Sequence, residues 1–132
     1  MLMTSRMPYL DATSVETDFD IAPDCIFLQG GVLTETGLIE NAAQSCAAIV
    51  AQSYVHRNEN DEVVGRAIGF ISAIKKIEIL DLPKVNERIL TKGTLLSRYD
   101  DDNFSLCTME TATFRNGELI VACTFNFLIH AI

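Results

Sequence analysis

The stretch ETGLIENAAQSCAAIVAQSY, residues 35–54, decides how the rest of the chain can fold. Its apolar residues recur with the 3.6-residue repeat of an α-helix, and they are Leu38, Ile39, Ala42, Ala43, Cys46, Ile49, Val50 and Tyr54. Alanine and serine cover most of the remaining helix surface, so that neighbouring backbone can approach from several sides. The pattern predicts one long helix enclosed by the rest of the protein.

Four β-like segments follow this helix, with no second helical repeat. They are residues 66–80, 88–99, 103–114 and 118–132. The last alternates most cleanly, because every second residue from Leu119 to Ile129 is apolar. Asn116 and Gly117 join the last two segments, and Asn-Gly predicts a tight hairpin because both residues accept positive φ.

The residues before the helix predict one further strand. Residues 14–21 alternate apolar and acidic side chains, the period-2 pattern of a half-buried strand. Pro23 ends this strand, and residues 24–33 contain Gly30 and Gly31, which favour a loop. Residues 1–13 show neither repeat, and we expect them to be irregular.

The length and composition predict one folded domain over residues 1–132. The chain has 132 residues, of which 48% are hydrophobic and 21% charged, so it can bury a sizeable core. The predicted strands are longer than the usual ~5 to 6 residues, which suits a strongly curved sheet. We therefore predict an α+β fold in which a curved antiparallel sheet wraps one central helix.

Composition also excludes several functions. A net charge of −8 argues against binding to a phosphate backbone, so we expect no nucleic-acid partner. No apolar run approaches the ~20 residues of a membrane span, and residues 1–7 lack the layout of a signal peptide, so we expect a cytoplasmic protein. The four cysteines have no zinc-site spacing, so we expect reduced thiols, no metal and no cofactor.

Residues 37–44, GLIENAAQ, resemble the start of the central helix in the hot-dog-fold 3-hydroxyacyl-acyl-carrier-protein dehydratases. The Ile-Glu-x-Ala-Ala-Gln pattern is most similar to the aryl polyene branch of that family. The resemblance continues through residues 70–74 (FISAI), Pro83 and the Asn116-Gly117 hairpin. It implies a hot-dog fold, a homodimer or higher homo-oligomer with acyl chains in tunnels at the interface, and acyl thioesters carried on acyl carrier protein or coenzyme A.

The chain departs from that family at its catalytic histidine. The family places this histidine in a His-Phe-Pro-Gly loop before the helix, whereas this chain has no histidine before His56 and carries CIFLQ, residues 25–29, in that neighbourhood. Dehydration requires an acid and a base, with backbone amides polarising the thioester carbonyl. Glu40 is the candidate catalytic carboxylate, and Gln44 lies one turn further on, where it can hydrogen-bond to Glu40.

Other candidate site residues lie before the helix. The amides of Gly30, Gly31 and Val32 are candidates for an oxyanion hole, although turn formation explains the glycines equally well. Asp24 is a weaker candidate for a second acid or base, and Cys25 for a nucleophile. Five apolar residues are candidates to line an acyl tunnel, with core packing as the default role of such side chains, and they are Phe70, Leu106, Met109, Phe125 and Phe127.

Three functions remain open from the sequence. The first is a dehydratase-like enzyme of fatty-acid or specialised lipid biosynthesis that uses Glu40. The second is an acyl-thioester hydrolase with the same carboxylate as base or nucleophile, because loss of the histidine impairs dehydration more than hydrolysis. The third is a non-catalytic acyl-binding protein or partner subunit, which the missing histidine favours and the retained Glu40 and Gln44 disfavour.

Overall fold

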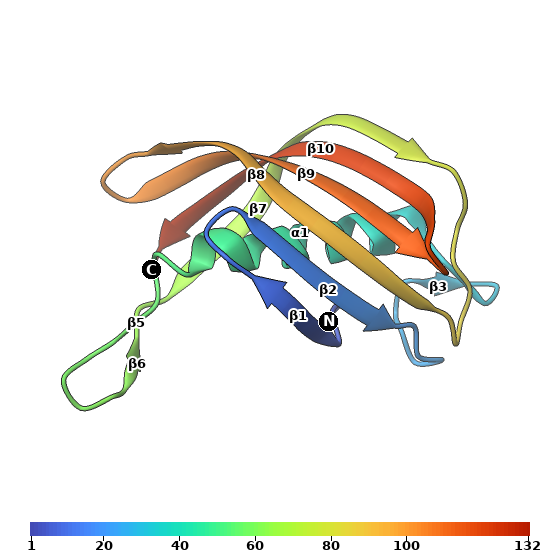
Figure 1. Ribbon diagram of the computed structural model, residues 1–132, viewed down its shortest axis with the longest axis horizontal. Helices are drawn as coiled ribbons and strands as arrows, with labels where there is room; N and C mark the ends of the chain where they lie inside the picture. The colour runs from blue at the N-terminus through green and yellow to red at the C-terminus, as the bar shows by residue number, and fades with distance from the viewer.

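An antiparallel sheet of six strands arches over one α-helix in the computed structural model (Figure 1). The structure describes residues 1–132 apart from the side chain of His56. Its elements are β1 (Arg6–Leu10), β2 (Ser14–Asp20), β3 (Leu28–Gln29), β4 (Val32–Leu33), α1 (Glu35–Ala51), β5 (His56–Arg57), β6 (Val63–Val64), β7 (Ala67–Ile79), β8 (Arg88–Asp100), β9 (Phe104–Arg115) and β10 (Glu118–Ala131).

The sheet has the strand order β1-β2-β8-β9-β10-β7, and each neighbouring pair is antiparallel. The predicted hairpin is confirmed, because Arg115 pairs with Glu118 around Asn116 at φ 52° and Gly117 at φ 79°. The long predicted strands are also confirmed, since β7 to β10 each run for 12 to 14 residues. This strand order places β7 at one edge of the sheet. In the chain, β7 follows α1 and the short pair β5–β6.

The helix α1 begins at Glu35, as predicted, and ends at Ala51, three residues before the predicted end. Thr34 caps its first turn by accepting a hydrogen bond from the Gly37 amide at 3.2 Å. The concave face of the sheet covers one side of α1, whereas the opposite side is only half-buried, so the helix is less enclosed than expected. Among the described residues, no helix has the length and apolar character that crossing a membrane requires.

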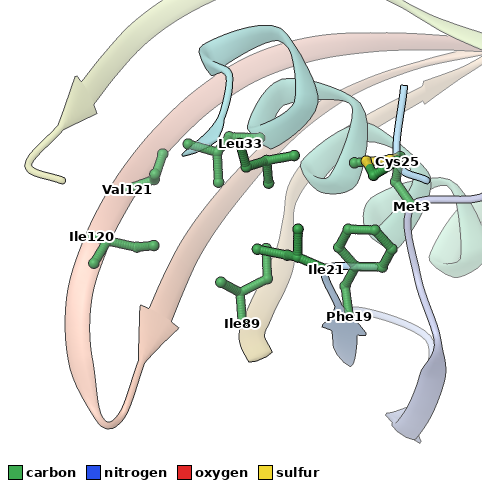
Figure 2. Packing of buried hydrophobic residues seen from close by; sticks show 9 residues of the cluster. Met3, Phe19, Ile21, Cys25, Leu33, Ile89, Ile120 and Val121 are labelled. Atoms are coloured by element: carbon green, nitrogen blue, oxygen red, sulfur yellow. The ribbon is translucent and has the colours of Figure 1, made fainter. Parts of the chain in front are cut away.

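The core consists of two hydrophobic clusters along α1. Figure 2 shows the first, in which Met3, Phe19 and Ile21 pack with residues of β8, β10 and the loop before the helix. The second lies between the later turns of α1 and strands β9 and β10, where Phe125 and Phe127 are its largest members. The alternation in β10 correctly predicts the face that meets the helix from residue 121 onward, while a register shift just before it leaves Leu119 exposed.

Three segments before and after the helix differ from the sequence-based expectation. Residues 1–13 are not wholly irregular, because β1 pairs with β2 and Arg6 forms ion pairs with Asp18 and Asp20. The expected loop 24–33 contains the short pair β3–β4. The polar stretch after the helix forms a second short hairpin, β5–β6, which projects from the body of the protein (Figure 1).

Candidate functional site

The buried side of α1 carries a hydrogen-bonded polar network. The Asn41 side-chain amide donates to the Met3 carbonyl at 2.7 Å, and its oxygen accepts from the Thr91 hydroxyl at 2.6 Å. The Ser45 hydroxyl donates to the Asn41 carbonyl at 2.7 Å and lies 2.6 Å from the Thr17 hydroxyl. Each of these buried side chains has a partner, so the network fixes α1 against β2, β8 and the N-terminal segment.

The other side of α1 borders a groove against β7. The groove has a volume of about 380 Å³ and is lined by Ile39, Glu40, Ala43, Gln44, Ala47, Gly69, Phe70, Ile71, Ile74 and Phe127. Three helix residues on successive turns, Ile39, Ala43 and Ala47, leave room along its length because two of them are alanine. The groove is therefore an apolar channel with polar groups toward the start of the helix.

Glu40 and Gln44 provide those polar groups. The predicted hydrogen bond between them is confirmed, since Gln44 Nε2 lies 3.4 Å from Glu40 Oε2. Gln44 is itself fixed by the N-terminal segment, accepting from the Met3 amide at 2.7 Å and donating to the Met1 carbonyl at 2.9 Å. Among the described residues Glu40 makes no ion pair and no other side-chain hydrogen bond, so its carboxylate is available to a ligand in the groove.

Gly30, Gly31 and Val32 lie in the β3–β4 hairpin just before the helix cap. Both glycines have positive φ, 60° and 76°, so the turn itself requires them. The Gly31 carbonyl accepts from the Val85 amide at 2.8 Å, and Val32 forms a bridge with Lys84. A separate hollow of about 660 Å³ lies beside residues 26–29 and the first residues of α1, and neither it nor the groove is lined by Gly30, Gly31 or Val32.

The two weaker candidates differ in their surroundings. Asp24 is exposed in the turn after Pro23, away from the residues that line the groove. Cys25 is 5% exposed and packs in the first hydrophobic cluster, as Figure 2 shows. A side chain in that position contributes to the core, and the structure offers it no ligand-accessible surface.

All four cysteines are free thiols in buried positions. Burial raises the pKa of the Cys46 thiol to about 12 and also raises the pKa of Cys107 and Cys123. These thiols therefore stay protonated and behave as small apolar side chains. Among the described side chains, no group of three or more His, Cys, Asp or Glu gathers in a way that could hold a metal ion.

A polar cluster at the far end of α1 was not foreseen. Arg98 donates to Asp100 and to the Ser53 hydroxyl, both at 2.7 Å, and the Ser105 hydroxyl lies 2.7 Å from that of Tyr54. The Ser105 hydroxyl and the Arg98 guanidinium hold the pKa of Asp100 below its usual value. These bonds join the β8–β9 hairpin to the end of the helix, so the cluster is structural.

His130 is not among the residues that line the groove. His130 lies on β10 between residues that face the helix, as expected, and its ring is half-buried on the other face of the sheet. The polar sequence of residues 56–61 predicts a surface position for His56, and the side chain of that residue lies outside what the structure describes. Of the five apolar residues proposed from the sequence for a tunnel, Phe70 and Phe127 line the groove, whereas Leu106, Met109 and Phe125 do not. The sequence did not indicate six further lining residues, which are Ile39, Ala43, Ala47, Gly69, Ile71 and Ile74, because only the tertiary fold places β7 beside this side of the helix.

Comparison with solved structures finds this architecture in several proteins at low sequence identity. The dehydratase heterocomplex ApeI:P from Xenorhabdus doucetiae matches with a TM-score of 0.74 and 18% identity, over 96% of this chain and 81% of that chain. A hypothetical thioesterase from Streptococcus pneumoniae, solved with coenzyme A, matches with a TM-score of 0.64 and 13% identity, over 94% and 84%.

A third solved structure is a mutant of the phenylacetic acid degradation protein PaaI from Thermus thermophilus. It matches with a TM-score of 0.66 and 12% identity, over 96% of this chain and 93% of that chain. No protein-family model and no curated protein sequence matches the chain. Likeness at such identities shows the fold alone, and the fold of this chain is the hot-dog fold.

Proposed function

We propose that this protein acts on acyl thioesters, with the acyl chain in the groove between α1 and β7 and Glu40 as the acid–base residue. The observation that carries the proposal is a half-buried carboxylate, free of ion pairs among the described residues, at the polar end of an apolar groove. A half-buried carboxylate without a cationic partner indicates a role at the groove. Charged side chains are seldom taken out of water without a partner, and the neighbouring alanines offer none. Gln44, fixed by the N-terminal segment, orients it.

Dehydration of a 3-hydroxyacyl thioester is the leading reaction. The Glu40 carboxylate removes a proton from the α-carbon, the hydroxyl leaves from the β-carbon, and a carbon–carbon double bond forms between them. The carboxyl group that accepted the α-proton can then protonate the departing hydroxide, which yields water and restores the carboxylate. The N–H groups of Gly30, Gly31 and Val32 do not line this groove, so the reaction proposed here assigns them no contact with the thioester carbonyl. Fold similarity to a dehydratase complex supports this order of preference.

Thioester hydrolysis is the second candidate. One observation favours it: Glu40 is the one ionisable side chain among the described residues that line the groove. Hydrolysis needs a single base to deprotonate water, or a single carboxylate nucleophile, and it releases the carboxylic acid and a free thiol. The similarity to a hypothetical thioesterase solved with coenzyme A agrees with this alternative.

An assay of products separates these reactions. Purified protein is incubated with 3-hydroxyacyl and saturated acyl thioesters, on acyl carrier protein and on coenzyme A, while enoyl product and free thiol are both followed. The test variant is Glu40→Gln, and Glu35→Gln, an exposed carboxylate in the first turn of the same helix, is the matched control. Enoyl product lost only in the Glu40 variant supports dehydration, and thiol lost only there supports hydrolysis. Turnover of neither substrate class contradicts both and leaves a non-catalytic acyl binder or partner subunit.

We also propose that two copies of the chain pair through β7. This strand runs for 13 residues at the edge of the sheet, and its exposed apolar side chains include Phe70, Ile74 and Ile77. A long apolar edge strand is a template for pairing with another strand. Light scattering after size exclusion should give a dimer that Ile77→Lys converts to a monomer, because lysine at an edge opposes pairing. A monomeric parent protein would contradict this assembly.

A further inference from the structure

Toward the C-terminal end of α1 the groove is lined by an aromatic ring that lies over a glycine, because Gly69 pairs with Ile129, whose carbonyl accepts from the Tyr54 hydroxyl just beyond the helix at 3.4 Å. Gly69 on β7 pairs with Ile129 of β10, and the ring of Phe127 lies beside that pair. A Cβ atom added to Gly69 would lie 2.6 Å from both Cε1 and Cζ of Phe127, closer than real side chains approach. The ring therefore occupies the space that a larger residue at position 69 would fill.

The Phe127 ring is firmly held in this position. It is 2% exposed and packs edge-on against Phe125, with ring centroids 6.4 Å apart. Because both Gly69 and Phe127 also line the groove, the ring presents a fixed wall to anything that lies there. The opposite end of the groove is marked by Glu40, so the two features define a length.

That length can be estimated from the helix. Glu40 and Ala47 are seven residues apart, so the groove runs for about 10 Å along α1 at ~1.5 Å per residue. Carbon–carbon bonds of about 1.5 Å at angles of about 111° advance an extended chain by roughly 1.25 Å each, so about eight bonds fit between the carboxylate and the wall. Resting on the proposed function for the identity of the ligand, we propose that the Gly69–Phe127 pair sets the acyl length, and that the substrates are medium-chain acyl groups of about eight to ten carbons.

The wall predicts how affinity depends on chain length. Each methylene group that enters the groove should tighten binding by about fourfold until the chain meets the ring. Longer chains must then leave their ends in water or displace Phe127, so the gain per methylene stops. Affinity against length should therefore rise and then level off or fall within the medium-chain range.

Two variants should move this limit in opposite directions. Phe127→Leu shortens the wall residue and should raise the optimal length by about two carbons, because a smaller side chain leaves space at the groove end. Gly69→Ala should lower the optimum, since the new methyl group pushes the ring toward the groove. Phe19→Leu is the matched control, because Phe19 is a buried ring of the first hydrophobic cluster that neither lines the groove nor belongs to the cluster of Phe127.

The test is equilibrium binding of saturated acyl-coenzyme A thioesters from butyryl to palmitoyl, measured by titration calorimetry for the parent and the three variants. Thermal unfolding of each protein identifies any variant that fails to fold, and Gly69→Ala keeps the test decisive if Phe127→Leu does not fold. Opposite shifts of the optimum, with none in Phe19→Leu, support the inference even if no turnover is found. An optimum unchanged in Gly69→Ala and Phe127→Leu, or shifted equally in the control, overturns the inference alone. Absence of binding at every length overturns it together with the proposed function.

Discussion

The two sides of α1 carry polar side chains under opposite conditions. On the side that faces the sheet, Asn41 and Ser45 are fully buried and bonded to partners from three other segments. On the side that borders β7, Glu40 is half-buried among alanines, and its one side-chain hydrogen bond, from Gln44, is long at 3.4 Å. The first arrangement stabilises the fold, whereas the second leaves a carboxylate without an ion pair among the described residues.

This contrast separates residues that are adjacent in sequence. Glu40 and Asn41 are neighbours, yet their side chains point to different sides of the helix and have different numbers of partners. Substitutions on the buried side should change the free energy of unfolding, and substitutions on the groove side should change turnover.

Glu40→Gln should have the largest effect. Loss of the acid–base carboxylate should reduce kcat/KM by about 100-fold or more, because general acid–base groups typically contribute that much. The free energy of unfolding should change by no more than about 0.5 kcal/mol, since the side chain is half-buried and has no ion pair among the described residues. Turnover kinetics and urea unfolding measure the two quantities. A large loss of stability would place Glu40 with the structural residues and break the contrast.

Asn41→Ala should affect the free energy of unfolding rather than turnover. It removes two buried hydrogen bonds and leaves the Met3 carbonyl without its donor, so the free energy of unfolding should fall by about 2 to 4 kcal/mol. Asn126→Ala is the control, because Asn126 has one side-chain bond, from Thr108 at 3.1 Å, on the half-buried outer face of the sheet. Equal losses in the two variants by urea unfolding would show that the buried network has no special role.

Gln44→Leu tests a residue that belongs to both sets of contacts, because Gln44 lines the groove and also bonds to the N-terminal segment. We expect kcat to fall by about tenfold with KM nearly unchanged, since the variant leaves Glu40 in place but unoriented. Steady-state kinetics with the preferred substrate measures both constants. A change confined to KM would instead assign Gln44 to ligand binding.

The buried Cys46 thiol predicts a stability effect at alkaline pH alone. Its pKa is about 12 in the folded protein against an ordinary value of 9.0, so folding favours the protonated thiol. The stability from this group is complete below pH 9 and is lost as the pH rises from 9 toward 12. Unfolding free energies across that window should fall less steeply in Cys46→Ala. Rapid alkylation of Cys46 in the folded protein at about pH 8 would contradict its burial.

The sequence predicted the elements whose signals are local. The repeat in α1, the alternation in most of β10 and the Asn116-Gly117 turn each lie within one segment, and each is confirmed. Strand β1 was missed because all five of its residues are exposed and show no alternation, while contacts such as Arg6 with Asp18 and Asp20 come from tertiary structure. The Glu40–Gln44 bond was predictable because it depends only on helix spacing.

The rest of the site depends on contacts between distant segments. The N-terminal residues reach Gln44 across 41 positions of sequence, and no local pattern marks that contact. Gly69 and Phe127 meet because β7 and β10 pair in a register that shifts near Phe125 and Phe127. Cys25 belongs to the core for a similar reason, since residues from several other segments surround it. Such contacts are fixed by the whole fold.

The most direct test of the account is a crystal structure with a non-hydrolysable medium-chain acyl-pantetheine analogue. We predict that the α-carbon of the analogue lies about 3 to 3.5 Å from a Glu40 carboxylate oxygen, the distance that removal of the α-proton requires. The chain should pass Ala43 and Ala47 and end at the Phe127 ring. An analogue bound in the hollow beside Ile26 and Leu82, or with its chain outside the α1–β7 groove, would contradict the central claim.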